Sequence, residues 1–325
     1  MGAQMIRRTL LALGLLALGA PSLHAAVVTV TDCANDPHLQ VNLGSDQTKI
    51  DVGADDLVVM CALGPLGGTH RVALAAHNLT VRGNVAGSST TSAVQMDASG
   101  TFAAIGVVIQ SSNNNGDMSI TAAGDMTFTD STVIVGPDLT NGGDTMNIEC
   151  TNAAPDCTIT ATNSTFKSGN LFITAVGDIL MRTTHIVTSS PRDDSRIESI
   201  HGNVCLPCDD DISGGNESSL KIFAFGFIDL PAINILVAQN ITITSGIGAG
   251  AASVDAHIDL TGASINNNFG KTGAITITAD EGHAQVTIQD ATIIQEGPDV
   301  ATINGRSTLP HQGFNHIVGV PILDT

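Results

Sequence analysis

The sequence predicts an all-β protein, a single-domain right-handed parallel β-helix that forms a solenoid with capped ends. Three observations predict it: a recurring octapeptide, short strands with period-2 alternation, and polar residues at the turns between them. The composition agrees, because 42% of the residues are hydrophobic, 34 are Gly, and the chain has no Trp and no Tyr. Strands and turns accept this mixture more readily than helices do.

The octapeptides share apolar residues at positions one, three and eight, with Ala161 counted as apolar. Alternation at positions one and three is that of a strand with one buried face, and Asp, Asn or Gly at position five bends the chain. The long gap between residues 186 and 258 is expected to hide further copies. The copies are MTFTDSTV (126–133), ITATNSTF (159–166), ILMRTTHI (179–186), IDLTGASI (258–265) and VTIQDATI (286–293), with FAAIGVVI (102–109) as a weaker sixth.

A second phrase precedes most copies, so one coil consists of a strand, a tight turn, a strand, a corner and a strand. The phrase occurs as MSITA (118–122), LFITA (171–175), ITITS (241–245) and ITITA (275–279). One strand cannot bury its face alone, but coils stacked about 4.8 Å apart can. Stacking predicts two inward columns, Met126–Ile159–Ile179 and Phe128–Ala161–Met181.

Residues 1–25 have the pattern of a secretory signal peptide. Arg7 and Arg8 supply the positive charge, residues 10–20 are apolar, and Leu23-His24-Ala25 fits a cleavage site. The mature chain is therefore expected to be exported, to the periplasm, the cell surface or the medium. No transmembrane segment is expected after signal removal.

The net charge is −19, and loss of Arg7 and Arg8 with the leader makes it −21. Such a chain is repelled by phosphate groups, which disfavours nucleic acids and anionic membranes as partners. The acidity has two interpretations, which are solubility and the binding of cations on an acidic face.

Six cysteines in an exported chain favour disulfides. Sequence order favours the pairs Cys33–Cys61, Cys150–Cys157 and Cys205–Cys208, although other pairings remain open. A bridge between Cys150 and Cys157 would pin a corner loop.

The octapeptides resemble the repeats of bacterial surface β-helix proteins of the haemagglutinin-like and polymorphic outer-membrane types. The stretches VVTVTDCANDPHLQ, DLVVMC and HNLTVRG resemble the first coil of such proteins. The resemblance implies the pectin-lyase-like fold class and a first coil clamped by Cys33 and Cys61. It implies little about activity.

The expected organisation follows from the need to cap the open ends of a solenoid. Prolines at 298, 310 and 321 would stop strand pairing at the C-terminal end. The expected segments are a signal peptide at 1–25, a cap and first coil at 26–61, coils at 62–296 with an irregular insertion at 188–219, and a cap or tail at 297–325.

The insertion is where a solenoid commonly carries its function. Its run Asp209-Asp210-Asp211 is a candidate calcium site, and calcium is the cofactor to be considered; the alternative is a solvated acidic turn. Zinc held by Cys205 and Cys208 would need His201 and Asp209 as further ligands. The alternative for this C-x-x-C is a small-loop disulfide.

The pectin-lyase-like fold also hosts polysaccharide lyases and hydrolases, and hydrolysis requires converging carboxylates. The candidate catalytic residues are Asp193, Asp194, His185 and His201, with Arg192 and Arg196 as possible partners, although they match no enzyme pattern. His185 stands where other octapeptides have Ser or Thr, so it is equally a surface histidine on the outside of a coil. Sugar clefts commonly stack rings on Trp and Tyr, which this chain lacks.

Residues 223, 225 and 227 are Phe and share one strand face, while Ile222, Ala224 and Ile228 share the other. Both faces are then apolar. Either a second element covers the Phe face, or it is an exposed docking surface that would suit self-association.

The sequence thus predicts an exported, non-catalytic β-helix with a structural, surface or adhesion-type role. Its expected partners are cell-surface or matrix polymers, together with further copies of itself. The alternative function is a polysaccharide-active enzyme, either a lyase or a glycoside hydrolase, or a glycan-binding module.

Overall fold

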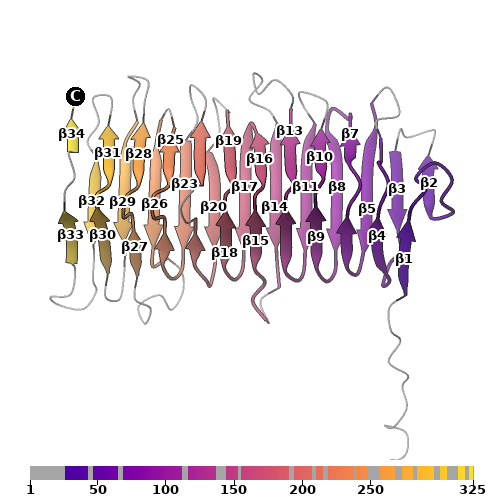
Figure 1. The fold of residues 1–325 in the computed structure, drawn as a ribbon, viewed down its shortest axis with the longest axis horizontal. Helices are drawn as coiled ribbons and strands as arrows, with labels where there is room; N and C mark the ends of the chain where they lie inside the picture. The colour runs from indigo at the N-terminus through magenta and orange to yellow at the C-terminus, as the bar shows by residue number, and fades with distance from the viewer. Residues whose placement is uncertain are drawn as a thin grey trace, which may run out of the picture.

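The computed structural model confirms an all-β solenoid, drawn in Figure 1 as a rod of stacked strands. It contains no helix among the residues that it describes. These are 26–42, 47–64, 69–111, 116–136, 144–152, 155–189, 194–206, 210–214, 219–237, 239–247, 256–267, 273–280, 284–295, 301–305, 314–318 and 322–324.

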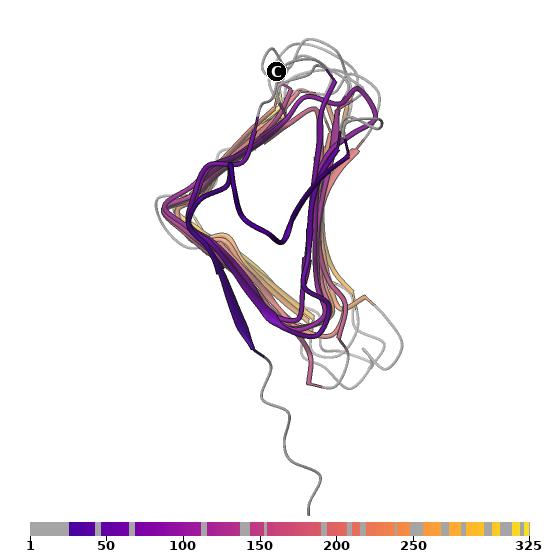
Figure 2. The same cartoon turned by 90° about the vertical axis from the view of Figure 1, so that its right-hand side faces the viewer.

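Three sheets form the sides of the rod, and Figure 2 shows their triangular cross-section. Sheet A contains β1 (Val27–Val30), β4 (Asp56–Val59), β6 (Leu79–Val81), β9 (Phe102–Ile105), β12 (Met126–Thr129), β15 (Ile159–Thr162), β18 (Ile179–Arg182), β21 (Val204–Cys205), β24 (Ile228–Asp229), β27 (His257–Asp259), β30 (Gln285–Gln289) and β33 (Phe314–Val318).

Sheet B has the longest strands. It contains β2 (Leu39–Asn42), β3 (Gln47–Asp51), β5 (Arg71–Ala76), β8 (Ser92–Ala98), β11 (Asp117–Ala122), β14 (Thr145–Cys150), β17 (Asn170–Ala175), β20 (Asp194–Ser199), β23 (Ser219–Ala224), β26 (Ile241–Ser245), β29 (Ile275–Ala279) and β32 (Thr302–Gly305).

Sheet C completes each coil. It contains β7 (Val85–Gly87), β10 (Val108–Ser111), β13 (Thr132–Val135), β16 (Thr165–Ser168), β19 (His185–Thr188), β22 (Asp211–Gly214), β25 (Asn234–Leu236), β28 (Ser264–Asn267), β31 (Thr292–Gln295) and β34 (Ile322–Asp324). Neighbouring strands within each sheet are parallel except for the pair β2–β3, which is antiparallel.

The predicted register is confirmed. Met126 pairs with Ile159 and Ile159 with Ile179, while the adjacent inward column is Phe128, Ala161 and Met181. Small side chains in one sheet are compensated by large side chains from another. Phe128 has the small Ala161 as its neighbour in the column, and the ring of Phe166 from sheet C lies 5.2 Å from the Phe128 ring. The core is therefore packed between sheets as well as along them.

The corner at position five of the octapeptide is also confirmed, because the backbone there is left-handed in every described copy. The corner residues are Asp130, Asn163, Thr183 and Asp290, with φ between 49° and 53°, and the glycines Gly106 and Gly262. Ala232, with φ of 53°, marks a copy that the sequence analysis missed, IDLPAINI at 228–235. Asp and Asn tolerate this conformation, and Gly adopts it freely.

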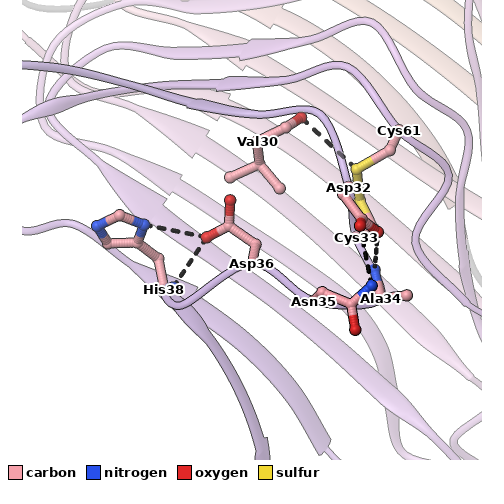
Figure 3. The surroundings of a disulfide bond; sticks show 8 residues. All are labelled: Val30, Asp32, Cys33, Ala34, Asn35, Asp36, His38 and Cys61. Atoms are coloured by element: carbon pink, nitrogen blue, oxygen red, sulfur yellow. Dashed lines mark hydrogen bonds and ion pairs between the residues drawn. A yellow bond between two sulfur atoms is a disulfide. The ribbon is translucent and has the colours of Figure 1, made fainter.

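The N-terminal end is closed by the chain itself. After β1 the chain crosses the end of the triangle to reach β2, which pairs antiparallel with β3 (Figure 2). The disulfide Cys33–Cys61 ties this crossing to the end of β4 (Figure 3). The Asp32 carboxylate accepts hydrogen bonds from the Asn35 side chain and the Ala34 N–H, which hold the pKa of Asp32 below its ordinary value.

Two expected boundaries need correction. Regular coils begin inside the segment 26–61, because β3 and β4 already pair in parallel with β5 and β6. The segment 297–325 adds β32, β33 and β34 to all three sheets instead of ending the pairing. The prolines at 298, 310 and 321 fall outside the described strands, so they remove no hydrogen bond from them.

The described strands within the expected insertion at 188–219 continue the regular coils. Strands β20, β21 and β22 pair with the coils on both sides. The corner between Val204 and Ile212 is one residue longer than in the octapeptide, since these residues pair with Ile179 and Ile186. The octapeptide pattern assumes a fixed spacing, so it does not detect a copy whose corner is one residue longer.

Candidate functional site

His185 lies on the outer face of sheet C, where β19 pairs it with Asp211 of β22. Its Nδ1 forms a hydrogen bond and ion pair with the Asp211 carboxylate. Both side chains are substantially exposed. The histidine is therefore on the outside of a coil, as its Ser/Thr-equivalent position in the octapeptide indicated.

The two described acids of the run Asp209-Asp210-Asp211 point to opposite sides of the chain. Asp210 turns inward and is 4% exposed, while Asp211 faces outward. Asp210 occupies the buried corner column that holds Ser131, Ser164 and Thr184 in the preceding coils, and it accepts a hydrogen bond from the Thr184 N–H. Asp209 lies outside the described residues. Within the described part of the chain, no group of three His, Cys, Asp or Glu side chains is arranged to hold a metal ion.

Arg196 lies on the outer face of sheet B. Its guanidinium forms an ion pair with Glu198 on the same strand and lies 4.9 Å from the ring centre of Phe223 in the next coil. Asp194 begins the same strand, β20. Asp193 and Arg192 lie outside the described residues.

His201 lies at the turn between sheets B and A. Its Nδ1 is 3.5 Å from the Asp156 carboxylate, and its ring is 6.3 Å from that of Phe225. The described catalytic candidates therefore lie on sheet C, on sheet B and at this turn, and the structure does not bring them together.

The expectation of one Phe strand face is wrong, because β23 ends at Ala224 and only Phe223 of the three lies on the outer face of sheet B. Phe225 and Phe227 lie in the turn that follows, before β24. Phe223 and Phe225 are half-buried, with Arg196 over the first ring and His201 beside the second, whereas Phe227 is 39% exposed. Ile222, Ala224 and Ile228 are buried in the core.

Two of the three expected disulfides are present, Cys33–Cys61 and Cys150–Cys157. Cys205 has a free thiol in the described part of the chain, and Cys208, the partner expected for it, lies outside the described residues. Cys205 is on β21, half-buried beside Asp229 of β24; burial and then this carboxylate raise the pKa of the thiol to about 11. The two disulfides indicate folding in an oxidising environment.

The sequence analysis missed the outer face of sheet B as a whole. Alternate residues of each strand point outward, and the register aligns two of these positions into columns that run through all the coils from β3 to β32. The first column is Lys49, Ala73, Gln95, Ser119, Asn147, Phe172, Arg196, Lys221, Thr242, Thr276 and Thr302, and the second is Asp51, Ala75, Asp97, Thr121, Glu149, Thr174, Glu198, Phe223, Thr244, Thr278 and Asn304. Aligning the phrases of the MSITA type across all coils would have found them.

These observations define the protein as a right-handed parallel β-helix. Comparisons of the chain with protein-family models, with curated proteins and with solved structures find no match. Over its described residues the structure holds no helix with the length and apolar character needed to cross a membrane.

Proposed function

We propose that the protein is an exported structural rod that serves as a surface, matrix or adhesion-type component and catalyses no reaction. One observation carries this proposal: inward columns run unbroken through the coils, so that the chemistry of the side chains is presented on flat outer faces. One inward column of sheet B, which lies between the two outward columns, illustrates this. It consists of Ile50, Leu74, Met96, Ile120, Ile148, Ile173, Ile197, Ile222, Ile243, Ile277 and Ile303.

The packing supports a rigid spacer. Each coil contacts its two neighbours, and the stability of such a rod accumulates over the contacts between coils. The disulfide Cys33–Cys61 closes one end in the oxidising conditions expected outside the cytoplasm. A rod of this kind would hold cell-surface or matrix polymers at fixed positions along its length.

Localisation and turnover test this role together. Antibody labelling of intact producing cells should detect the protein at the surface or in the surrounding matrix, and purified protein should not depolymerise acidic polysaccharides. Confinement to the cytoplasm would refute the role. So would turnover that is lost in Asp194→Asn but retained in the matched control Asp51→Asn, which also removes one carboxylate from sheet B.

A glycan-binding role is the second candidate, and the exposed aromatic residues favour it. Phe225 and Phe227 lie at the turn between sheets B and A, where their rings offer stacking surfaces for sugar faces. Affinity electrophoresis in gels that contain acidic polysaccharides would show retarded migration, relieved in Phe227→Ala. The control is Met60→Ala, which removes an exposed apolar side chain elsewhere on the rod. Equal migration of wild type and Phe227→Ala would exclude this site.

A further inference from the structure

The two outward columns of sheet B differ in charge. In the first column the charged residues are Lys49, Arg196 and Lys221, all cations. In the second column they are Asp51, Asp97, Glu149 and Glu198, all acids. This separation lies on a face whose two columns together carry a charge of only −1, in a chain whose net charge is −19.

Opposite charges are already paired across the columns within one copy. Lys49 Nζ lies 2.9 Å from Asp51 Oδ2, and Arg196 forms an ion pair with Glu198. The neutral Gln95 also bridges the columns, because its Nε2 donates to Asp97 Oδ2 at 2.5 Å. The described strands of sheets A and C contain no ion pair between residues two apart. On sheet A the two acids Asp229 and Asp259 instead stack on neighbouring coils, where burial and then this like charge raise the pKa of Asp229.

We propose that two copies of this chain pair through the outer faces of sheet B, with the rods side by side and pointing in the same direction. A twofold axis parallel to the rod places each strand opposite the same strand of the second copy and exchanges the two columns. Arg196 then faces Glu198 of the second copy, Lys49 faces Asp51, and Lys221 faces the ring of Phe223. Such an interface is isologous, so every contact occurs twice.

The exchange of columns excludes the other face-to-face arrangement. A twofold axis parallel to the strands would reverse the order of the coils and place each column against itself. Cations would then face a column whose charges are all positive, and acids a column whose charges are all negative. Like charges brought together at an interface cost several kcal/mol. The parallel arrangement has no like-charged pair directly opposite on any strand of these columns.

The uncharged positions also fit the parallel arrangement. Ala73 faces Ala75 where the two backbones approach, Asn147 faces Glu149, and Thr242 faces Thr244. In the dimer each ion pair becomes part of a four-membered network, which stabilises more than an isolated surface pair does. The Phe172 ring lies opposite the half-buried Thr174 and would lose its contact with water.

The face is large enough for a stable dimer. The strands from β3 to β32 stack about 4.8 Å apart and run for five residues of about 3.3 Å each, which gives roughly 800 Å² per copy. Stable protein interfaces of standard size bury about 800 Å² on each partner. Figure 2 shows one long side of the triangle as nearly straight, and the longest strands belong to sheet B.

A charge exchange tests the pairing on the full-length mature protein. Sedimentation equilibrium should show a dimer for the wild type, and Glu198→Lys should weaken its association about tenfold or more, because cations then face cations. The double variant Arg196→Glu with Glu198→Arg should restore the dimer, since the exchanged columns remain complementary. Asp211→Lys, which makes the same change of charge on the outer face of sheet C, should leave the dimer unchanged. A wild type that stays monomeric at high micromolar concentration, or a double variant as weak as Glu198→Lys, would overturn the proposal.

Cross-linking tests the direction of the rods. In a Cys205→Ser background, Thr242→Cys mixed with Thr244→Cys should form an intermolecular disulfide, and each variant alone should form little. A dimeric wild type that forms no mixed disulfide between Thr242→Cys and Thr244→Cys would overturn the parallel arrangement. Retention of the wild type as a monomer by an acidic polysaccharide, relieved in Lys221→Glu, would assign the face to a glycan and refute the dimer.

Discussion

Buried positions inside the sheets of this rod are mostly apolar, whereas many buried positions at one of its corners are polar, and the two differ in how they stabilise the fold. Inside the sheets the columns are apolar, as in Ile148, Ile173, Ile197 and Ile222 of sheet B. At the corner between sheets C and B several buried residues are polar, among them Asp144, Ser168, Asn170 and Ser219. The apolar columns stabilise each coil by burial alone, whereas the polar corner depends on individual hydrogen bonds. The corner is therefore where the rod should respond to solution conditions.

Hydrogen bonds at this corner form both within a coil and between neighbouring coils. Ser168 Oγ donates to the Asn170 carbonyl at 2.6 Å, and the Asn170 N–H donates to the Asp144 carbonyl at 2.8 Å. The side chain of Asp144 is 1% exposed, and no hydrogen bond to its Oδ1 is present in the structure. Burial, and then the nearby Asp117, raise the pKa of Asp144 to about 6. This carboxyl is thus a buried group whose hydrogen bonds are incomplete, and its burial disfavours the ionised form.

The largest expected effect lies in the apolar interior. Phe128→Ala removes a ring that contacts Phe102 at 5.4 Å and Phe166 at 5.2 Å, and it leaves a cavity beside Ala161. We expect a loss of about 3–5 kcal/mol in the free energy of unfolding, measured by chemical denaturation. Thr129→Ala on the outer face of the same strand should cost less than about 0.5 kcal/mol. A loss below about 1 kcal/mol for Phe128→Ala would contradict the packed interior.

The next effect lies in the polar corner and depends on pH. The pKa of Asp144 in the folded chain lies above its unfolded value, so ionisation opposes folding, and stability falls as the pH rises from about 4 to about 6. Asp144→Asn resembles the protonated form at every pH. We expect the variant to match the wild type near pH 4 and to exceed it by up to roughly 3 kcal/mol at pH 7. Denaturation at a series of pH values measures the difference.

Asp51 provides a control of opposite sign. A hydrogen bond from Lys49 and then one from the Gly53 N–H lower the pKa of Asp51, so its contribution to stability is present above its unfolded pKa and is lost as the solution becomes acidic. Asp51→Asn should therefore lower stability slightly at pH 7 and have no effect at low pH. A constant gap between wild type and Asp144→Asn from pH 4 to pH 7 would show that ionisation of Asp144 is not its cause.

The same contrast explains which parts of the fold the sequence predicts. Apolar periodicity and turn residues were sufficient for the register of Met126, Ile159 and Ile179 and for the corner at Asn163, because burial imposes both on every coil. The coil at 194–214 was missed because Ser195 and Ser199 occupy inward positions of β20 and the following corner holds an extra residue. Polar residues can be buried there because groups in neighbouring coils form hydrogen bonds with them. A pattern read along the sequence does not show which residues those neighbours are.

The candidate site was predicted less well, for a related reason. Asp210 and Asp211 are adjacent in sequence but point to opposite sides of the chain, as neighbours on a strand do. Proximity in sequence suggested a cluster at 188–219, yet Arg196, His201 and His185 belong to different sides of the triangle. The columns of sheet B join residues that are a whole coil apart, so they become visible only when the coils are aligned.

The smallest expected effect concerns the other corner, between sheets A and C, where the constraint lies in the backbone. Thr183 has a φ of 52°, a conformation that a β-branched residue adopts at a cost, whereas Asn163 occupies the same position one coil earlier with a φ of 49°. Thr183→Asn should therefore raise the free energy of unfolding by about 1 kcal/mol. Asp130→Asn, at the same position two coils earlier, should change it little, because Asp and Asn both tolerate this conformation. If Thr183→Asn instead destabilises the rod, a side-chain contact of Thr183 stabilises the fold by more than its backbone conformation costs. This corner would then depend on side-chain bonds, as the corner between sheets C and B does.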